Sequence, residues 1–318
     1  MWFKQLQLFQ LTETLPAKAM LEEKLAALAF QPCPHFLFES LGWVSPLDEE
    51  GAPLVHSIKN YMMLCLQIEE KILPSSVVQH ALQEKVKEIS RIKNTPVRQK
   101  EKLALKDDII RQLLPQAFSK HARLYALIDT QKNLLILNTA NEKKTEQFMR
   151  LFKQTISENI QAIKPEKLAN LMAQWLKYPE KLDEFSIEKS AALYDPQQKN
   201  RTIRCQQQDL LTTNIQAFLK EGLEVKQLAL GWEDQINFVL SEKGSLQSIQ
   251  YQDKLTSQTA DLELETKQQQ FEADCMIMAG SLFALAKDLL PLYGDNVASI
   301  KKESSRGVVK ADESILMV

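Results

Sequence analysis

Polar and apolar positions alternate at the start of the chain, and this period predicts a strand over residues 2–11. Residues 61–68 form an almost unbroken apolar run of strand length, and residues 42–44 add a short strand. Two further apolar runs, 124–128 and 134–137, flank the turn-forming sequence Asp-Thr-Gln-Lys-Asn and predict a hairpin. We therefore expect a sheet in the first half of the chain.

Apolar residues spaced three and four positions apart predict helices between and after these strands. Two of the helices, 74–94 and 97–114, follow each other directly and form a helical hairpin. Pro74 suits a helix start, because a proline there loses no hydrogen bond, and Pro96 disfavours helix at the residue before it. The other predicted helices cover residues 17–30, 142–156, 165–177, 210–221 and 271–290.

The second half of the chain adds predicted strands at 201–205, 224–230, 235–240 and 245–251. Strands and helices mix without a regular strand–helix–strand rhythm, so the predicted class is α+β, with mixed sheets, flanking helices and a protruding helical hairpin. At 318 residues the chain is long enough for two or three compact units, since a domain has roughly 150 residues as a loose average. We expect a discontinuous central α+β domain, a helical arm, a second α+β (base) domain and a flexible tail, over residues 1–72 with 122–164, 73–121, 165–294 and 295–318.

Charge is distributed unevenly, although the whole protein has 39 basic and 41 acidic residues. Residues 85–123 hold eleven cations against four anions, a net charge of +7, whereas the rest of the chain carries −9. Clustered Lys and Arg release condensed counterions from phosphates, so this stretch is the candidate DNA-binding surface. A solvated helical face without a partner has the same pattern and stays open. The candidate residues are Lys85, Lys87, Arg91, Lys93, Arg98, Lys100, Lys102, Lys106, Arg111, Lys120 and Arg123.

Sequence patterns typical of enzymes are absent from the chain. Its eight glycines are too far apart to form a dinucleotide-binding or phosphate-loop motif. The four cysteines and four histidines do not have the spacing of a zinc site. We expect a binding protein without metal or cofactor. The start of the chain lacks the pattern of a secretory signal, and the longest apolar run, 275–286, falls short of the ~20 residues that span a bilayer. We therefore expect a cytoplasmic protein with no membrane partner.

Two alternatives from other functional classes stay open. One is a metal-dependent nuclease, because paired carboxylates can hold Mg²⁺, although adjacent carboxylates usually diverge on a helix or strand. The other is a protein-interaction scaffold whose basic helices meet an acidic partner. The carboxylate pairs that the nuclease would use are Glu49-Glu50, Glu69-Glu70 and Asp107-Asp108.

Seven short sequences, spread over residues 1–294, are similar in order and spacing to those of the RdgC family, the recombination-associated proteins of proteobacteria. No single one of them is decisive, and the tail after residue 294 lies outside the resemblance. The matching segments are 2–4, 42–44, 69–74, 113–120, 203–210, 228–232 and 271–274.

The resemblance implies a nucleoid-associated protein that binds duplex DNA with little sequence preference, and it leaves binding of single strands open. It also implies a ring-shaped homodimer around the DNA and a role in restraining the RecA recombinase by competing for DNA. The helical hairpin then corresponds to the arm that closes one side of the ring. Phe118 matches an apolar position at the root of that arm and is expected either to contact the second subunit or to pack in the core.

One segment departs from the family pattern. By resemblance, Arg204, Gln207 and Gln208 are expected to contact DNA. The family pattern includes lysine in this segment, whereas this chain has glutamine at Gln206, Gln207 and Gln208. Glutamine hydrogen-bonds to a phosphate but releases no counterion, so if this segment touches DNA we expect either weaker binding or a weaker salt dependence here than in the family.

Overall fold

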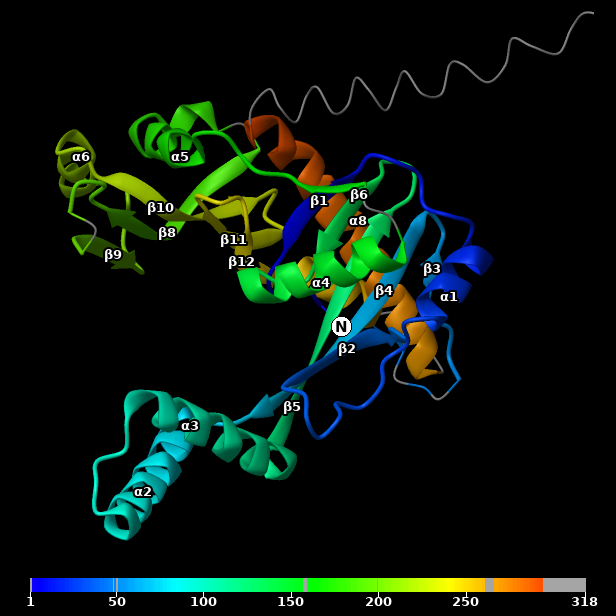
Figure 1. The fold of residues 1–318 in the computed structure, drawn as a ribbon. Helices are drawn as coiled ribbons and strands as arrows, with labels where there is room; N and C mark the ends of the chain where they lie inside the picture. Colours follow the sequence, from blue (N-terminus) through cyan, green and yellow to red (C-terminus); the bar gives the residue numbers. More distant parts are fainter. Residues whose placement is uncertain are drawn as a thin grey trace, which may run out of the picture.

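The computed structural model contains two antiparallel sheets, a long helix that packs against both, and a projecting pair of helices (Figure 1). This arrangement confirms the predicted α+β class. The predicted tail, 295–318, lies outside the residues that the structure describes. Those residues are 2–47, 49, 51–156, 159–182, 184–198, 200–260 and 266–293.

The first sheet has seven strands in the order β2-β4-β5-β6-β1-β7, with β3 paired to β4. The predicted hairpin is confirmed as β5–β6, and β3 and β7, of three residues each, were too short to be predicted. The predicted first strand is shorter than expected and begins at Gln7. The bounds are β1 Gln7–Leu11, β2 Glu39–Val44, β3 His56–Ile58, β4 Tyr61–Ile72, β5 Phe118–Asp129, β6 Leu134–Leu137 and β7 Ile160–Ala162.

The helices that cover the first sheet are α1 (Lys18–Ala26), α4 (Glu142–Thr155) and α8 (Lys267–Leu289). Strand residues alternate between two apolar cores, so that Leu64 and Leu66 pack with α1 and α4, whereas Met63 packs with α8. The α4 side chain Phe148 meets Trp43 edge to face in the first of these cores. The two faces of the sheet are therefore both buried, and α4 is fixed in place by its apolar side.

The second sheet has five strands in the order β12-β11-β10-β8-β9. Its strands are β8 Phe185–Tyr194, β9 Thr202–Gln206, β10 Glu224–Trp232, β11 Ile236–Ser241 and β12 Leu246–Tyr251. The helices around it are α5 (Leu168–Lys177), α6 (Thr213–Lys220) and α7 (Asp253–Ala260). The four strands predicted here are confirmed. The strand β8 was missed because the exposed Lys189 interrupts its alternation of apolar residues, at the point where its register with β10 shifts. The helix α7 was missed as well.

The helix α8 begins at Lys267, earlier than the predicted 271, and supplies apolar residues to the core that it shares with the second sheet. By length and composition alone, Gln268–Tyr293 could cross a membrane. However, 56% of its most apolar window is buried inside the protein, as is typical of the core helix of a globular domain. We interpret α8 as the helix that joins the two sheets.

The projecting pair of helices, α2 (Ser75–Lys93) and α3 (Gln99–Leu113), confirms the predicted helical hairpin and is called the arm below. The left-handed backbone of Asn94 ends α2. The arm is carried by β4 and β5, which stay paired from Tyr61–Asp129 to Ile72–Phe118. These strands were predicted to end at 68 and to begin at 124. Their outer ends are charged or exposed and so lack the apolar signal of a buried strand. The predicted domain boundaries stay a prediction.

The root of the arm is tied to the loop before β2 by a buried carboxylate. The Glu69 side chain is 6% exposed and accepts a hydrogen bond from the backbone N–H of Cys33 at 2.8 Å. The Ser119 side chain also hydrogen-bonds to it, and the Lys71 N–H donates to the Phe38 carbonyl at 2.8 Å. The loop 31–38 is thereby held against the paired ends of β4 and β5.

This carboxylate should make the stability of the protein depend on pH. The Ser119 and Cys33 hydrogen bonds lower the pKa of Glu69 below its ordinary value of 4.5. A pKa that is lower in the folded state contributes stability above the ordinary value, and that stability is lost as the pH falls through the folded-state pKa. We expect the denaturant midpoint of the native protein to fall more than that of Glu69→Gln as the pH is lowered from about 5 to about 3. Glu180→Gln, a change at an exposed position, is the matched control, and parallel curves for native protein and Glu69→Gln would contradict this role.

Candidate nucleic-acid interface

The arm carries nine of the eleven predicted cations. Residues 75–113 hold nine basic and five acidic side chains, a net charge of +4. Seven of the nine cations are exposed, and Lys102 and Lys106 are half-buried. Because the two helices project from the body of the protein, these cations can be reached by a partner from several sides (Figure 1). The exposed members are Lys85, Lys87, Arg91, Lys93, Arg98, Lys100 and Arg111.

Ion pairs neutralise only part of this charge. Lys93 Nζ lies 2.5 Å from Glu101 Oε1 and links α2 to α3. Lys85 pairs with Glu88 at 2.8 Å, and Arg111 lies 3.8 Å from Asp108. Exposed pairs of this kind are weak and screened by salt. Within the described residues, the other six arm cations have no carboxylate within 4 Å, so they are available to a polyanion.

The last two predicted cations lie on β5 rather than on the helices. Lys120 stands opposite Glu70 in the β4–β5 pairing and contributes to the lowered pKa of that carboxyl. Arg123 stands opposite Gln67 and hydrogen-bonds to the phenol of Tyr125. The basic stretch of the sequence is therefore divided between the arm and the strands that carry it.

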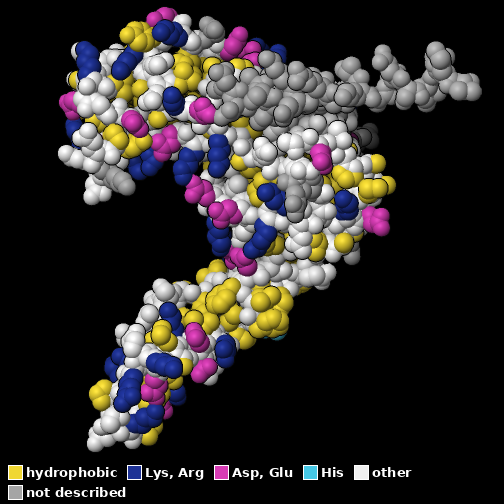
Figure 2. All heavy atoms as spheres, turned by 45° about the horizontal axis from the view of Figure 1, so that its top comes forward, with side chains coloured by type: hydrophobic (Ala, Val, Ile, Leu, Met, Phe, Trp, Pro, Cys, Tyr) yellow, Lys and Arg dark blue, Asp and Glu magenta, His cyan; other side chains and the backbone are white. Residues whose placement is uncertain are grey.

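A hollow separates the arm from the second sheet (Figure 2). Helices α5 and α6 lie on the side of this sheet away from the arm (Figure 1). Arg204 on β9 lines a shallow depression of about 280 Å³ together with Gln206, Gln227 and Gln247. The other two predicted residues lie just after the strand, since Gln207 has a positive φ of 54° and the Gln208 N–H donates to the Lys189 carbonyl.

Arg204 lies on a strand, as predicted, and Gln206, which was not among the predicted residues, lines the same depression. The signal for Gln206 is the strand period, because residues two apart on β9 share a face. The depression is lined mainly by amides and hydroxyls, which donate hydrogen bonds to phosphate oxygens without adding charge.

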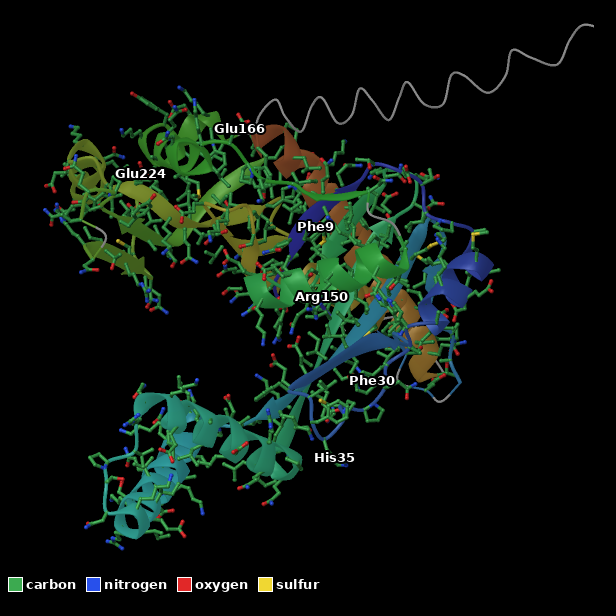
Figure 3. The ribbon with its side chains drawn as sticks, viewed as in Figure 1. Phe9, Phe30, His35, Arg150, Glu166 and Glu224 are labelled. Atoms are coloured by element: carbon green, nitrogen blue, oxygen red, sulfur yellow. The ribbon has the colours of Figure 1, made fainter. Side chains whose placement is uncertain are left out.

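An apolar patch lies at the root of the arm. Its members are Phe36, Phe38, Ile72 and Phe118, with Phe118 84% exposed and Phe36 77% exposed. Ile72 and Phe118 are direct partners across β4–β5. Beside them, a groove of about 440 Å³ is lined by residues of the 35–38 loop, including His35, and by residues from the end of α3 (Figure 3). Phe118 is therefore a surface residue, so the alternative that it packs in the core is wrong, and its role as a subunit contact stays a prediction.

The carboxylates considered for a nuclease are dispersed. Glu69 is buried and accepts the hydrogen bonds described above, and Glu70 forms an ion pair with Lys143 on α4. Asp107 and Asp108 are exposed on α3. Glu50 lies outside the described residues. Within the described part of the chain, no three His, Cys, Asp or Glu side chains form a group that could hold a metal ion.

Comparison with known proteins relates nearly the whole chain to one family. A family model described as "Putative exonuclease, RdgC" matches residues 1–296. The recombination-associated protein RdgC of Proteus mirabilis is 32% identical over 300 residues, which cover 92% of this chain and 98% of that protein. The proteins of the same name from Yersinia enterocolitica and Yersinia pestis are each 31% identical, with the same coverage. These matches show that the chain belongs to the RdgC family of recombination-associated proteins.

Proposed function

We propose that this protein binds DNA without sequence specificity and encircles the duplex as a homodimer. In this role it associates with the nucleoid and modulates recombination by limiting the access of RecA to DNA. The observation that carries the proposal is the arm, a projecting helical pair with a net charge of +4 beside an open hollow. Membership in a family of recombination-associated proteins supports the same setting.

Electrostatic contact with phosphates accounts for the lack of sequence preference. Lys and Arg side chains that contact phosphates fix a protein on the duplex but do not read the bases. Such contacts repeat uniformly along the duplex, so a protein held only by them can slide. A protein that covers DNA in this way competes with a recombinase for the same substrate, which is the proposed basis of the effect on RecA.

The apolar patch at the arm root supports self-association. A monomeric protein rarely leaves several large apolar side chains exposed together, and such patches mark interaction surfaces. We propose that Phe118 contacts the second subunit next to the groove at the end of α3. A contact there would join two arms and close one side of the hollow.

The family description names a second candidate function, an exonuclease. Mg²⁺-dependent loss of nucleotides from a labelled DNA end, abolished by Asp107→Asn with Asp108→Asn or by Glu70→Gln, would establish it. We place DNA binding first because the exposed arm cations support it directly, whereas the candidate carboxylates lie on separate elements.

The arm cations should set the salt dependence of DNA binding. The logarithm of the binding constant falls against the logarithm of salt concentration by about 0.9 for each phosphate that is neutralised. We expect the variant K93E/R98E/K100E/K102E to bind a labelled duplex more weakly, with a slope flatter by about 3. The value is below that for four full contacts because Lys93 already pairs with Glu101.

The matched control reverses four exposed lysines away from the arm, on α1, on α5 and after it, and on α6. It changes the net charge by the same amount and should keep most of the native slope. The control positions are Lys18, Lys177, Lys181 and Lys220. An unchanged slope in the arm variant would contradict the assignment of the arm as the phosphate-binding surface.

Phe118 should matter for association and not for folding. Because the side chain is 84% exposed, Phe118→Ser removes little packing within the monomer. Loss of an aromatic anchor at an interface raises the dissociation constant about tenfold to a hundredfold, and we expect this change in sedimentation equilibrium. Met20 is another exposed apolar residue, but it lies on α1, away from the arm, so Met20→Ser should leave association unchanged. Native dimerisation by Phe118→Ser would contradict the proposed contact.

A further inference from the structure

The inner wall of the hollow carries charges of both signs (Figure 2). Part of this wall is α4, whose residues Lys143 and Arg150 are two helical turns apart and therefore lie on one face. Their side chains are 65% and 63% exposed. Neither residue belongs to the basic stretch that the sequence analysis selected.

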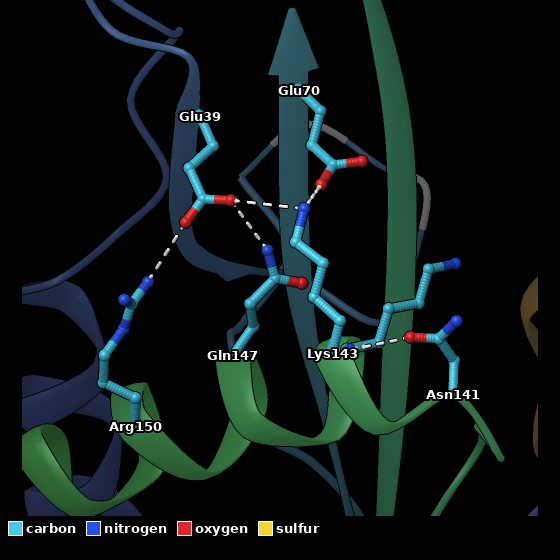
Figure 4. Close-up of polar contacts among 7 residues, drawn as sticks. Glu39, Glu70, Asn141, Lys143, Gln147 and Arg150 are labelled. Carbon is cyan, nitrogen blue, oxygen red and sulfur yellow. Dashed lines mark hydrogen bonds and ion pairs between the residues drawn. The ribbon is translucent and has the colours of Figure 1, made fainter.

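Two carboxylates, Glu39 and Glu70, form ion pairs with these cations (Figure 4). Glu39 Oε1 lies 3.4 Å from Arg150 Nη2, and Glu39 Oε2 lies 3.8 Å from Lys143 Nζ. Lys143 Nζ also donates to Glu70, and the Gln147 amide donates to Glu39 Oε2 at 2.9 Å. The cluster of two cations and two anions is thus neutral in the free protein.

The position of the two carboxylates is unfavourable on its own. Glu39 and Glu70 stand directly opposite each other in the antiparallel pairing of β2 with β4. Like charges in directly opposed positions destabilise a sheet. Lys143 and Arg150 offset this repulsion, but a neutral pair at the same positions would avoid it. The arrangement therefore favours a role that needs the two cations and also needs the carboxylates to pair with them.

The geometry also allows a phosphate to enter. An open depression of about 430 Å³ is lined by Glu39, Lys143, Glu146, Gln147 and Arg150. Ion pairs between mostly exposed cations and partly exposed carboxylates are weak, because water screens them. A DNA phosphodiester carries one negative charge, as a carboxylate does, and offers the same cations two acceptor oxygens. Exchange of a carboxylate for a phosphate at this site therefore costs little.

We propose that Lys143 and Arg150 form a second phosphate-binding site on the wall of the hollow, and that Glu39 and Glu70 restrain it by occupying both cations until a DNA phosphate displaces them. This inference rests on the proposed DNA-binding function and adds its regulation. The arm, where six cations lack such partners among the described residues, then supplies most of the affinity. The restrained wall keeps the total attraction low enough for the DNA to move and to leave.

The test compares three variants in binding to a labelled duplex across a salt series. The first, E39Q/E70Q, frees the cations while keeping side-chain size. We expect it to bind about threefold to tenfold more tightly, with a slope steeper by up to about 0.9 for each freed cation. The second, K143Q/R150Q, should bind more weakly than the native protein, with a flatter slope. The third, which combines all four changes, should lose the gain of the first.

E13Q/E180Q, at two exposed positions, controls for the removal of two negative charges. Equal binding by E39Q/E70Q and E13Q/E180Q would overturn the proposal, and so would a gain that persists in the fourfold variant. If E39Q/E70Q has a lowered melting temperature and does not fold fully, K143Q/R150Q decides, and an unchanged slope in that variant overturns the proposal. Absence of any salt-dependent binding by the native protein would instead refute the DNA-binding function itself.

Discussion

The continuous pairing of β4 with β5 is the constraint on which the rest of the structure depends. At one end, from Tyr61–Asp129 inward, the two strands form the centre of the first sheet and are buried on both faces. At the other end the same pairing leaves the sheet and carries the arm out to Ile72–Phe118. The continuous backbone hydrogen bonds between β4 and β5 therefore fix the position of the arm relative to the core. The buried Glu69 carboxylate and the ion pairs of Glu70 brace the point where the strands leave the sheet.

The distribution of charge differs between the arm and the body of the protein that carries it. The arm has a net charge of +4, and most of its cations are free of ion pairs among the described residues. The wall of the hollow, by contrast, holds Lys143 and Arg150 in a neutral cluster with Glu39 and Glu70. A chain with slightly more acidic than basic residues can in this way present a local surface that attracts a polyanion. The apolar patch around Phe118 lies between these two regions, at the root of the arm.

The sequence predicted the elements whose period was undisturbed. The hairpin β5–β6 and the arm helices were found, because their apolar spacing is regular and Pro96 marks the turn between the helices. The strand β8 was missed at its irregular register, and the outer ends of β4 and β5 were missed because exposed strands lack an apolar signal. The arm cations could be predicted from clustering alone. Lys143 and Arg150 could not, since α4 has a net charge of only +2, and the ion pairs of the two cations with Glu39 and Glu70 depend on tertiary packing.

Encirclement of DNA by a closed dimer is tested most directly by binding to linear duplexes whose ends are either free or blocked by bulky protein caps, each across a salt series. We predict salt-sensitive binding to the free-ended duplex and markedly slower or weaker binding to the blocked one, because a closed ring loads over an end. Equal rates and affinities for the two duplexes would contradict a closed ring. Absence of salt-sensitive binding to either duplex would contradict DNA binding through the arm.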